Sequence, residues 1–149
     1  MLFLALGALV FVLDQGAKWY VSTALVPGAA VALVPGLLSF VRVDNPGAAF
    51  GLGRGQPFLL ILAGALALVA AVFLAWRRRR EPWWQTALGI GAGGALSNLV
   101  DRLTRGFILD FIDLGFWPVF NLADLAVVVA VALIIWRLWA EQGGVGGCL

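Results

Sequence analysis

Four long apolar stretches dominate this chain of 149 residues and limit what it can fold into. The hydrocarbon core of a bilayer is about 30 Å thick, and a helix needs about 20 residues to cross it. Each stretch has about this length, and the second contains no charged residue. The stretches cover about residues 1–21, 57–76, 83–102 and 122–139. We therefore predict an all-α membrane protein, a four-transmembrane-helix bundle that forms one domain over residues 1–149.

The overall composition supports a membrane location. Hydrophobic residues make up 62% of the chain and charged residues 12%, whereas soluble domains have about 45–50% and about 25%. A soluble fold of this size leaves too much surface in water to hide so many apolar side chains. The first stretch lacks a basic start and a small-residue cleavage site, so we interpret it as a retained span and not as a signal peptide.

The run Arg77–Arg80 between the second and third stretches sets the expected orientation. Basic residues between two spans indicate a cytoplasmic loop, so we expect no nucleic-acid partner and place both termini in the cytoplasm. Six of the eight acidic residues then fall toward the outer side. These six are Asp14, Asp44, Asp101, Asp110, Asp113 and Asp124.

The longest connection, about residues 27–56, has the pattern of short strands. Proline and glycine mark turns at residues 27–28 and 35–36, and residues 39–44 alternate in the manner of a strand. We predict a small extracytoplasmic β element of two or more strands. The segment Gly53-Arg54-Gly55 is a candidate for a mobile cover of a site.

The available reactive groups narrow the chemistry. The chain has no histidine, which excludes Ser-His and Cys-His nucleophile pairs and the commonest zinc ligand. Its one cysteine, Cys148, has no internal disulfide partner, and we interpret it as incidental. We therefore expect no metal or cofactor, and catalysis would depend mainly on carboxylates.

Two pairs of charged residues are expected mainly to support the fold. Asp14 and Lys18 are four residues apart and share one helix face, where an ion pair would hold the first span against its neighbours. Asp101 and Arg102 end the third span, close to Asn98, and suit the organisation of a loop. A role in shaping a reactive site is the alternative for both pairs.

Asp110 and Asp124 are the stronger candidates for catalysis. Asp110 lies in an apolar run after the third span, and Asp124 lies one turn into the fourth, so both are expected near the outer boundary of the bilayer. Two carboxylates brought together there would share one proton and could hydrolyse an amide by general acid–base catalysis. Asp113 is expected to be a solvated loop residue. A proton or cation pathway in a transporter, and a scaffold without catalysis, are the alternatives.

Five segments carry a resemblance to a known family. The chain resembles the bacterial lipoprotein signal peptidases (signal peptidase II), whose motifs it matches in order from the first span to the fourth. Ser97 stands where that family usually has glycine, which is the clearest departure. The matching segments are Asp14-Gln15-x-x-Lys18, Asn45–Phe50, Gly93–Arg102, Gly106–Asp113 and Phe120–Asp124.

The resemblance implies an aspartic endopeptidase of the bacterial inner membrane. It implies prolipoprotein substrates, cut just before a cysteine that carries a diacylglyceryl group, contact with membrane lipid, a small β-cradle, and inhibition by globomycin. It also implies a catalytic dyad of Asp110 and Asp124, and we expect a monomer. The positions that support the site or bind substrate would be Asp14, Lys18, Asn45, Asn98, Asp101, Arg102 and Asn121.

Overall fold

The computed structural model describes residues 1–47 and 55–143. Most of the segment proposed as a mobile cover, together with Cys148 and residues 48–50 of one motif, lies outside the described residues. The described part contains four helices and three strands. The helices are α1 (Leu2–Ala24), α2 (Pro57–Arg77), α3 (Pro82–Arg105) and α4 (Leu122–Gly143).

Three of these helices are long and apolar enough to cross a membrane. Their most apolar windows have mean hydropathies of 1.4 for α1, 2.9 for α2 and 2.1 for α4. The expected third span is a continuous helix of 24 residues, α3, but it does not meet the same standard of hydropathy. Its second half carries the buried polar residues Ser97, Asn98 and Asp101, which explains the lower value.

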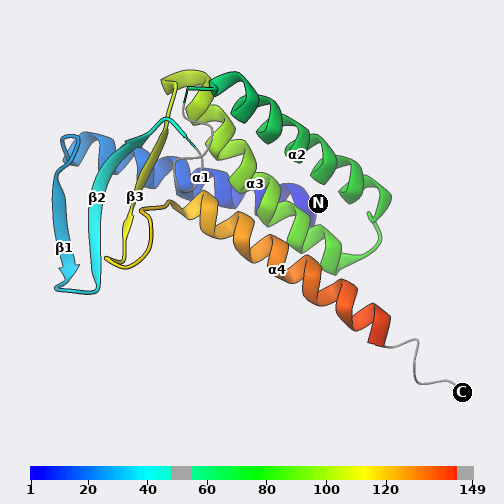
Figure 1. The fold of residues 1–149 in the computed structure, drawn as a ribbon. Coiled ribbons are helices and arrows are strands. Elements are labelled where there is room, and N and C mark those ends of the chain that lie inside the picture. Colours follow the sequence, from blue (N-terminus) through cyan, green and yellow to red (C-terminus); the bar gives the residue numbers. More distant parts are fainter. Residues whose placement is uncertain (48–54, 144–149) are drawn as a thin grey trace, which may run out of the picture.

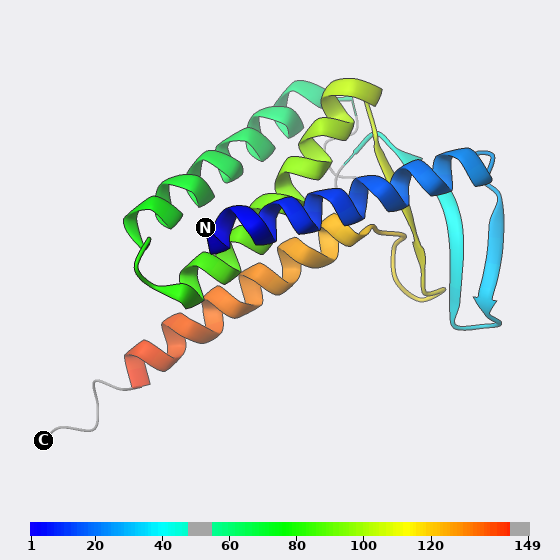
Figure 2. The same ribbon diagram turned by 180° about the vertical axis from the view of Figure 1, so that it is seen from behind.

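α3 is the central helix and packs against each of the other three (Figures 1 and 2). Small residues in α3 permit this close packing. A methyl group on Gly94 would collide with the backbone carbonyl of Ala123 in α4, and one on Gly89 would meet the backbone of Phe3 in α1. The close α3–α4 approach at Gly94 lies next to Asp124, so the packing also sets the position of that carboxylate.

The strands form one antiparallel sheet in the order β1 (Ala30–Val34), β2 (Leu38–Asn45) and β3 (Ile108–Asp113). The first two fall inside the segment expected to be β-like. The third strand was not predicted, because residues 107–112 form an apolar run without the alternation typical of a half-buried strand. In the register, Val43 lies opposite Asp110, and Asn45 lies opposite Ile108.

The sheet lies at one end of the bundle, opposite the α2–α3 connection (Figures 1 and 2). β3 is its most buried strand, and a core of Val21, Leu109 and Phe111 joins it to α1. β1 is exposed along its whole length. The buried strand therefore brings Asp110 to the ends of the helices.

Candidate active site

A cavity of about 580 Å³ opens between the sheet and the ends of α3 and α4. Asp110 from β3 and Asp124 from α4 both line it, so the structure brings together the two carboxylates that the sequence singled out. The rest of the wall is largely apolar. Its other lining residues include Asn45, Asn98, Arg102, Ile108, Trp117, Val127 and Val128.

Asp110 is buried, with 2% of its surface exposed. Its Oδ2 accepts a hydrogen bond of 2.9 Å from Asn45 Nδ2, and its Oδ1 accepts one of 2.7 Å from Asn121 Nδ2. Burial raises the pKa of Asp110 to about 6, and the nearby charge of Asp124 adds to this, while the two amide hydrogen bonds oppose it. Asp110 therefore titrates near neutral pH.

Asp124 lies in the first turn of α4. Its Oδ1 accepts a 2.7 Å hydrogen bond from Asn98 Nδ2. Its backbone N–H donates to Asn121 Oδ1 at 2.8 Å, so Asn121 caps the helix. The side chain of Asn121 thus contacts both aspartates: its NH₂ group donates to the carboxylate of Asp110, and its oxygen accepts from the backbone N–H of Asp124.

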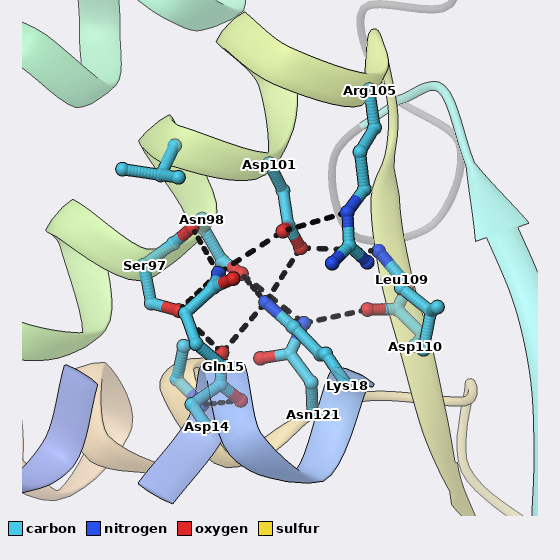
Figure 3. A network of polar contacts seen from close by, with 12 residues as sticks. Asp14, Gln15, Lys18, Ser97, Asn98, Asp101, Arg105, Leu109, Asp110 and Asn121 are labelled. Atoms are coloured by element: carbon cyan, nitrogen blue, oxygen red, sulfur yellow. Dashed lines mark hydrogen bonds and ion pairs between the residues drawn. The ribbon is translucent and has the colours of Figure 1, made fainter. Parts of the chain in front are cut away.

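Behind the cavity, the fully buried Lys18 lies at the centre of a cluster of polar residues (Figure 3). Its ammonium forms ion pairs of 2.7 Å with Asp14 and 2.8 Å with Asp101. A third contact of 2.9 Å goes from Lys18 Nζ to Asn98 Oδ1. The expected pair of Asp14 and Lys18 is present, and it contacts a residue that binds Asp124.

The two carboxylates of this cluster also hold backbone groups beside the cavity. Asp14 Oδ1 accepts a 2.9 Å hydrogen bond from the N–H of Ala123, which precedes Asp124. Asp101 Oδ2 accepts a 3.3 Å hydrogen bond from the N–H of Leu109, which precedes Asp110. Each supporting aspartate thus anchors the residue immediately before one member of the candidate dyad.

Two further members of the cluster were missed as site residues. Ser97 Oγ donates to Asp14 Oδ2 at 2.6 Å, and Gln15 Nε2 reaches Ser97 Oγ at 2.9 Å and Asp101 Oδ1 at 3.1 Å. From the sequence, Ser97 stood out only as a departure from the glycine that the family usually has there. Its hydroxyl was the available signal, because a polar group on the buried face of a helix needs a partner.

The remaining residues named from the sequence differ in position. Arg102 lines the cavity, and its Nη2 donates to Gly47 O at 3.4 Å, whereas its neighbour Asp101 points to Lys18. Asp113 ends β3 outside the cavity wall and accepts a 2.8 Å hydrogen bond from Gly115 N. Asp113 was expected to be a solvated loop residue. In the structure it is half-buried at the end of a strand and bonded into the turn that follows.

The three asparagines were expected to support the site or bind a substrate backbone. In the structure their amides contact the aspartates, and Asn121 is fully buried, so a supporting role fits it. Within residues 1–47 and 55–143, no three carboxylate or thiol side chains are grouped as a metal site requires. The arrangement has two carboxylates in a confined cavity, which suits general acid–base chemistry on a bound substrate.

Known proteins are similar to this chain in both sequence and fold. The family described as signal peptidase (SPase) II matches residues 6–140. A lipoprotein signal peptidase of Moorella thermoacetica is 39% identical, with 97% of each chain covered, and one of Syntrophomonas wolfei is 43% identical, with 85% of each covered.

Two solved structures, both described as bacterial membrane enzymes, have the same fold. One has a TM-score of 0.92 at 26% identity and covers 99% of this chain and 93% of its own. The other has a TM-score of 0.83 at 29% identity and covers 91% of each. Together with the family match over nearly the whole length, these relatives show that the chain belongs to the signal peptidase II family, whose members are membrane proteases.

Proposed function

We propose that this protein is an aspartic endopeptidase that removes the signal peptide from diacylglyceryl-modified prolipoproteins. It cuts just before the lipidated cysteine, and Asp110 and Asp124 form its catalytic dyad. The observation that carries the proposal is that both carboxylates line one cavity and are held by three asparagine amides. Relatives named lipoprotein signal peptidase support the substrate class.

The proposed chemistry needs one ionised and one protonated carboxyl. The ionised group removes a proton from water, which attacks the carbonyl carbon of the scissile amide, while the protonated group donates to the carbonyl oxygen. Two carboxyl groups in a mostly apolar cavity favour this state, because ionising both would place two negative charges close together. The other supporting residues, Asp14, Lys18, Asp101 and Arg102, keep this geometry or border the cavity.

We infer that the whole chain acts as a single peptidase domain of four spans. In addition to α1, α2 and α4, α3 is also a membrane span. α3 is the central helix, so its less apolar sequence would face other helices more than lipid. The arginines between α2 and α3 support a cytoplasmic position for that end, which places both termini inside and the sheet at the outer face.

This placement fits a lipid-modified substrate. Acyl chains on the cysteine stay in the bilayer, so the scissile bond would lie close to the membrane surface. A cavity at the helix ends beside the sheet meets such a bond without extracting the lipid. We propose that one chain suffices, because both members of the dyad come from the same chain.

The test uses purified full-length protein in lipid or detergent with a diacylglyceryl-modified prolipoprotein. Mass spectrometry should find a cut immediately before the modified cysteine, and globomycin should block it. No cleavage by the wild-type protein would reject the proposal. Cleavage that persists in both Asp110→Asn and Asp124→Asn would reject the dyad, and a change in ion flux with processing intact would favour a transporter.

A further inference from the structure

The orientation of the three asparagine amides around the aspartates can be read from their other partners. An asparagine side chain has a carbonyl oxygen that only accepts hydrogen bonds and an NH₂ group that only donates them. When one end of the amide contacts a group that can only donate or only accept, the orientation of the whole amide follows. The side-chain oxygen of each of the three asparagines accepts a hydrogen bond from a group that can only donate. The amide NH₂ group of each must therefore be the end that contacts the aspartate.

The amides that contact Asp110 both present donors. Asn45 Oδ1 accepts from the backbone N–H of Gly47 at 3.0 Å, which turns its NH₂ group toward Asp110 Oδ2. Asn121 Oδ1 accepts from the backbone N–H of Asp124 at 2.8 Å, which turns its NH₂ group toward Asp110 Oδ1. Both oxygens of Asp110 therefore face N–H groups, the environment of an ionised carboxylate.

Asp124 has a less symmetric environment. The Lys18 ammonium can only donate, and it donates to Asn98 Oδ1 at 2.9 Å, so the NH₂ group of Asn98 faces Asp124 Oδ1 at 2.7 Å. Among the described residues, the donor recorded for Asp124 Oδ2 is the backbone N–H of Asn121, at a long 3.4 Å. Oδ2 is therefore the oxygen of the pair best able to carry a proton.

We propose that the shared proton rests on Asp124 Oδ2, so that Asp110 is the general base and Asp124 the general acid. Asn45 and Asn121 are positioning residues for the base, and Asn98, oriented by Lys18, is the positioning residue for the acid. This assignment rests on the proposed function.

The assigned roles give a balanced reaction. Asp110 takes a proton from water, the water oxygen bonds to the amide carbon, and the carbonyl oxygen takes the proton of Asp124. In the collapse of the resulting diol, the carbon–nitrogen bond breaks and the nitrogen takes the proton from Asp110. A hydroxyl of the diol returns a proton to Asp124, so both residues regain their starting states.

Charged groups from each surrounding element act on the pair. Lys18 of α1 favours the ionised form of Asp110. An ionised Asp124 of α4 disfavours that form, and this repulsion is absent when Asp124 carries the proton. Arg102 of α3 interacts with both aspartates, and Asp44 of β2 lines the same cavity. With a pKa of about 6, Asp110 is mostly ionised at neutral pH, as a base requires.

The test compares two variants in the pH profile of kcat/KM. Removing an N–H donor from a carboxylate raises its pKa, so Asn45→Ala should move the acidic limb of the bell upward by about one pH unit. Asn98→Ala should instead move the alkaline limb upward by a similar amount. Ser39→Ala, also on β2 but outside the cavity wall, is the matched control and should move neither limb.

The outcomes separate this inference from the function itself. If Asn45→Ala moves the alkaline limb while the wild-type protein cleaves normally, the roles are reversed and the assignment is overturned. If Asn45→Ala moves neither limb in a folded and active protein, the assignment is also overturned. A wild-type protein without cleavage would reject the proposed function instead. Asn45 is half-buried at the end of β2, so this variant decides the matter even if Asn98→Ala fails to fold.

Discussion

Two neighbouring groups of carboxylates occupy this protein, and they differ in what surrounds them. Asp14 and Asp101 are fully buried and form ion pairs with the ammonium of Lys18. Asp110 is also buried and Asp124 is half-buried, but both line a cavity, and their closest partners are asparagine amides. Lys18 forms direct ion pairs with both acids of the first group, whereas within the described residues Asp110 and Asp124 form no ion pair, although Arg102 lines their cavity.

The difference separates a structural role from a reactive one. A buried carboxylate beside a cation stays ionised and holds its neighbours in place. Neutral amides do not fully offset the free energy needed to bury a negative charge. A buried carboxylate held mainly by amides therefore has a raised pKa, as Asp110 does with a pKa of about 6. Asn98 joins the groups, because it accepts from Lys18 and donates to Asp124.

The largest expected effect comes from neutralising the cavity pair. Asp110→Asn and Asp124→Asn should each lower the rate of prolipoprotein cleavage by about 10²–10⁴-fold, because each removes a group that transfers a proton. The rate is measured from product mass with purified protein. Asp113→Asn, on the same strand as Asp110, is the control and should keep near-wild-type activity. Equal loss in all three variants would contradict a specific dyad.

Removing the cation from the other group should act on stability. Lys18→Met leaves Asp14 without its counter-charge and leaves Asp101 with only the longer 3.7 Å ion pair to Arg105. Breaking a buried ion pair in this way costs about 3–5 kcal/mol in the free energy of unfolding. Thermal unfolding in detergent measures this. Arg137→Met breaks the exposed pair of Arg137 and Glu141 and should change little.

A second variant separates charge from shape in the Lys18 cluster. Adding Asp14→Asn and Asp101→Asn to Lys18→Met removes the uncompensated charges and should recover much of the lost stability. No recovery would indicate that the lysine acts through packing and not through charge.

Much of the fold could be predicted because lipid imposes simple requirements. Helix lengths and three membrane-capable helices follow from apolar runs, and two strands follow from turn residues and alternation. β3 was missed because residues 107–112 are almost uniformly apolar, and a buried strand of that kind has no alternation to reveal it. α3 falls below the hydropathy standard because it carries the polar residues Ser97, Asn98 and Asp101, which are buried inside the helical bundle.

The candidate site was predictable only in part. Sequence order suggested Asp110 and Asp124, and the fold places both at one cavity. The side-chain contacts of the asparagines with Asp110, Asp124 and Lys18 join residues 11 to 80 positions apart, which no local pattern contains. Ser97 shows the same limit, since its hydroxyl acquires a role only when α1 and α3 pack together.

The pH dependence of stability provides a sharper test of the cavity group. Asp110 has a pKa of about 6 in the folded protein and 3.8 as the unperturbed value, so the folded state binds the proton more tightly. The free energy of unfolding should therefore fall as pH rises from about 4 to 6, by up to about 3 kcal/mol from this residue, and then level off. Unfolding of wild type and Asp110→Asn at both ends of this range measures the effect, which should disappear in the variant.

The smallest expected effect tests the cluster residue that sequence reasoning overlooked. Ser97→Ala removes the 2.6 Å hydrogen bond to Asp14 Oδ2, and a buried hydrogen bond to a charged group contributes about 1.5–3 kcal/mol. Lys18 still pairs with Asp14, so the lower end is expected, measured by thermal unfolding. Ser22→Ala, which removes an exposed hydroxyl bonded to its own helix, is the control and should be nearly silent. If Ser97→Ala were as silent as Ser22→Ala, the ion pairs alone would hold Asp14, and the contrast between the two groups would rest on Lys18 alone.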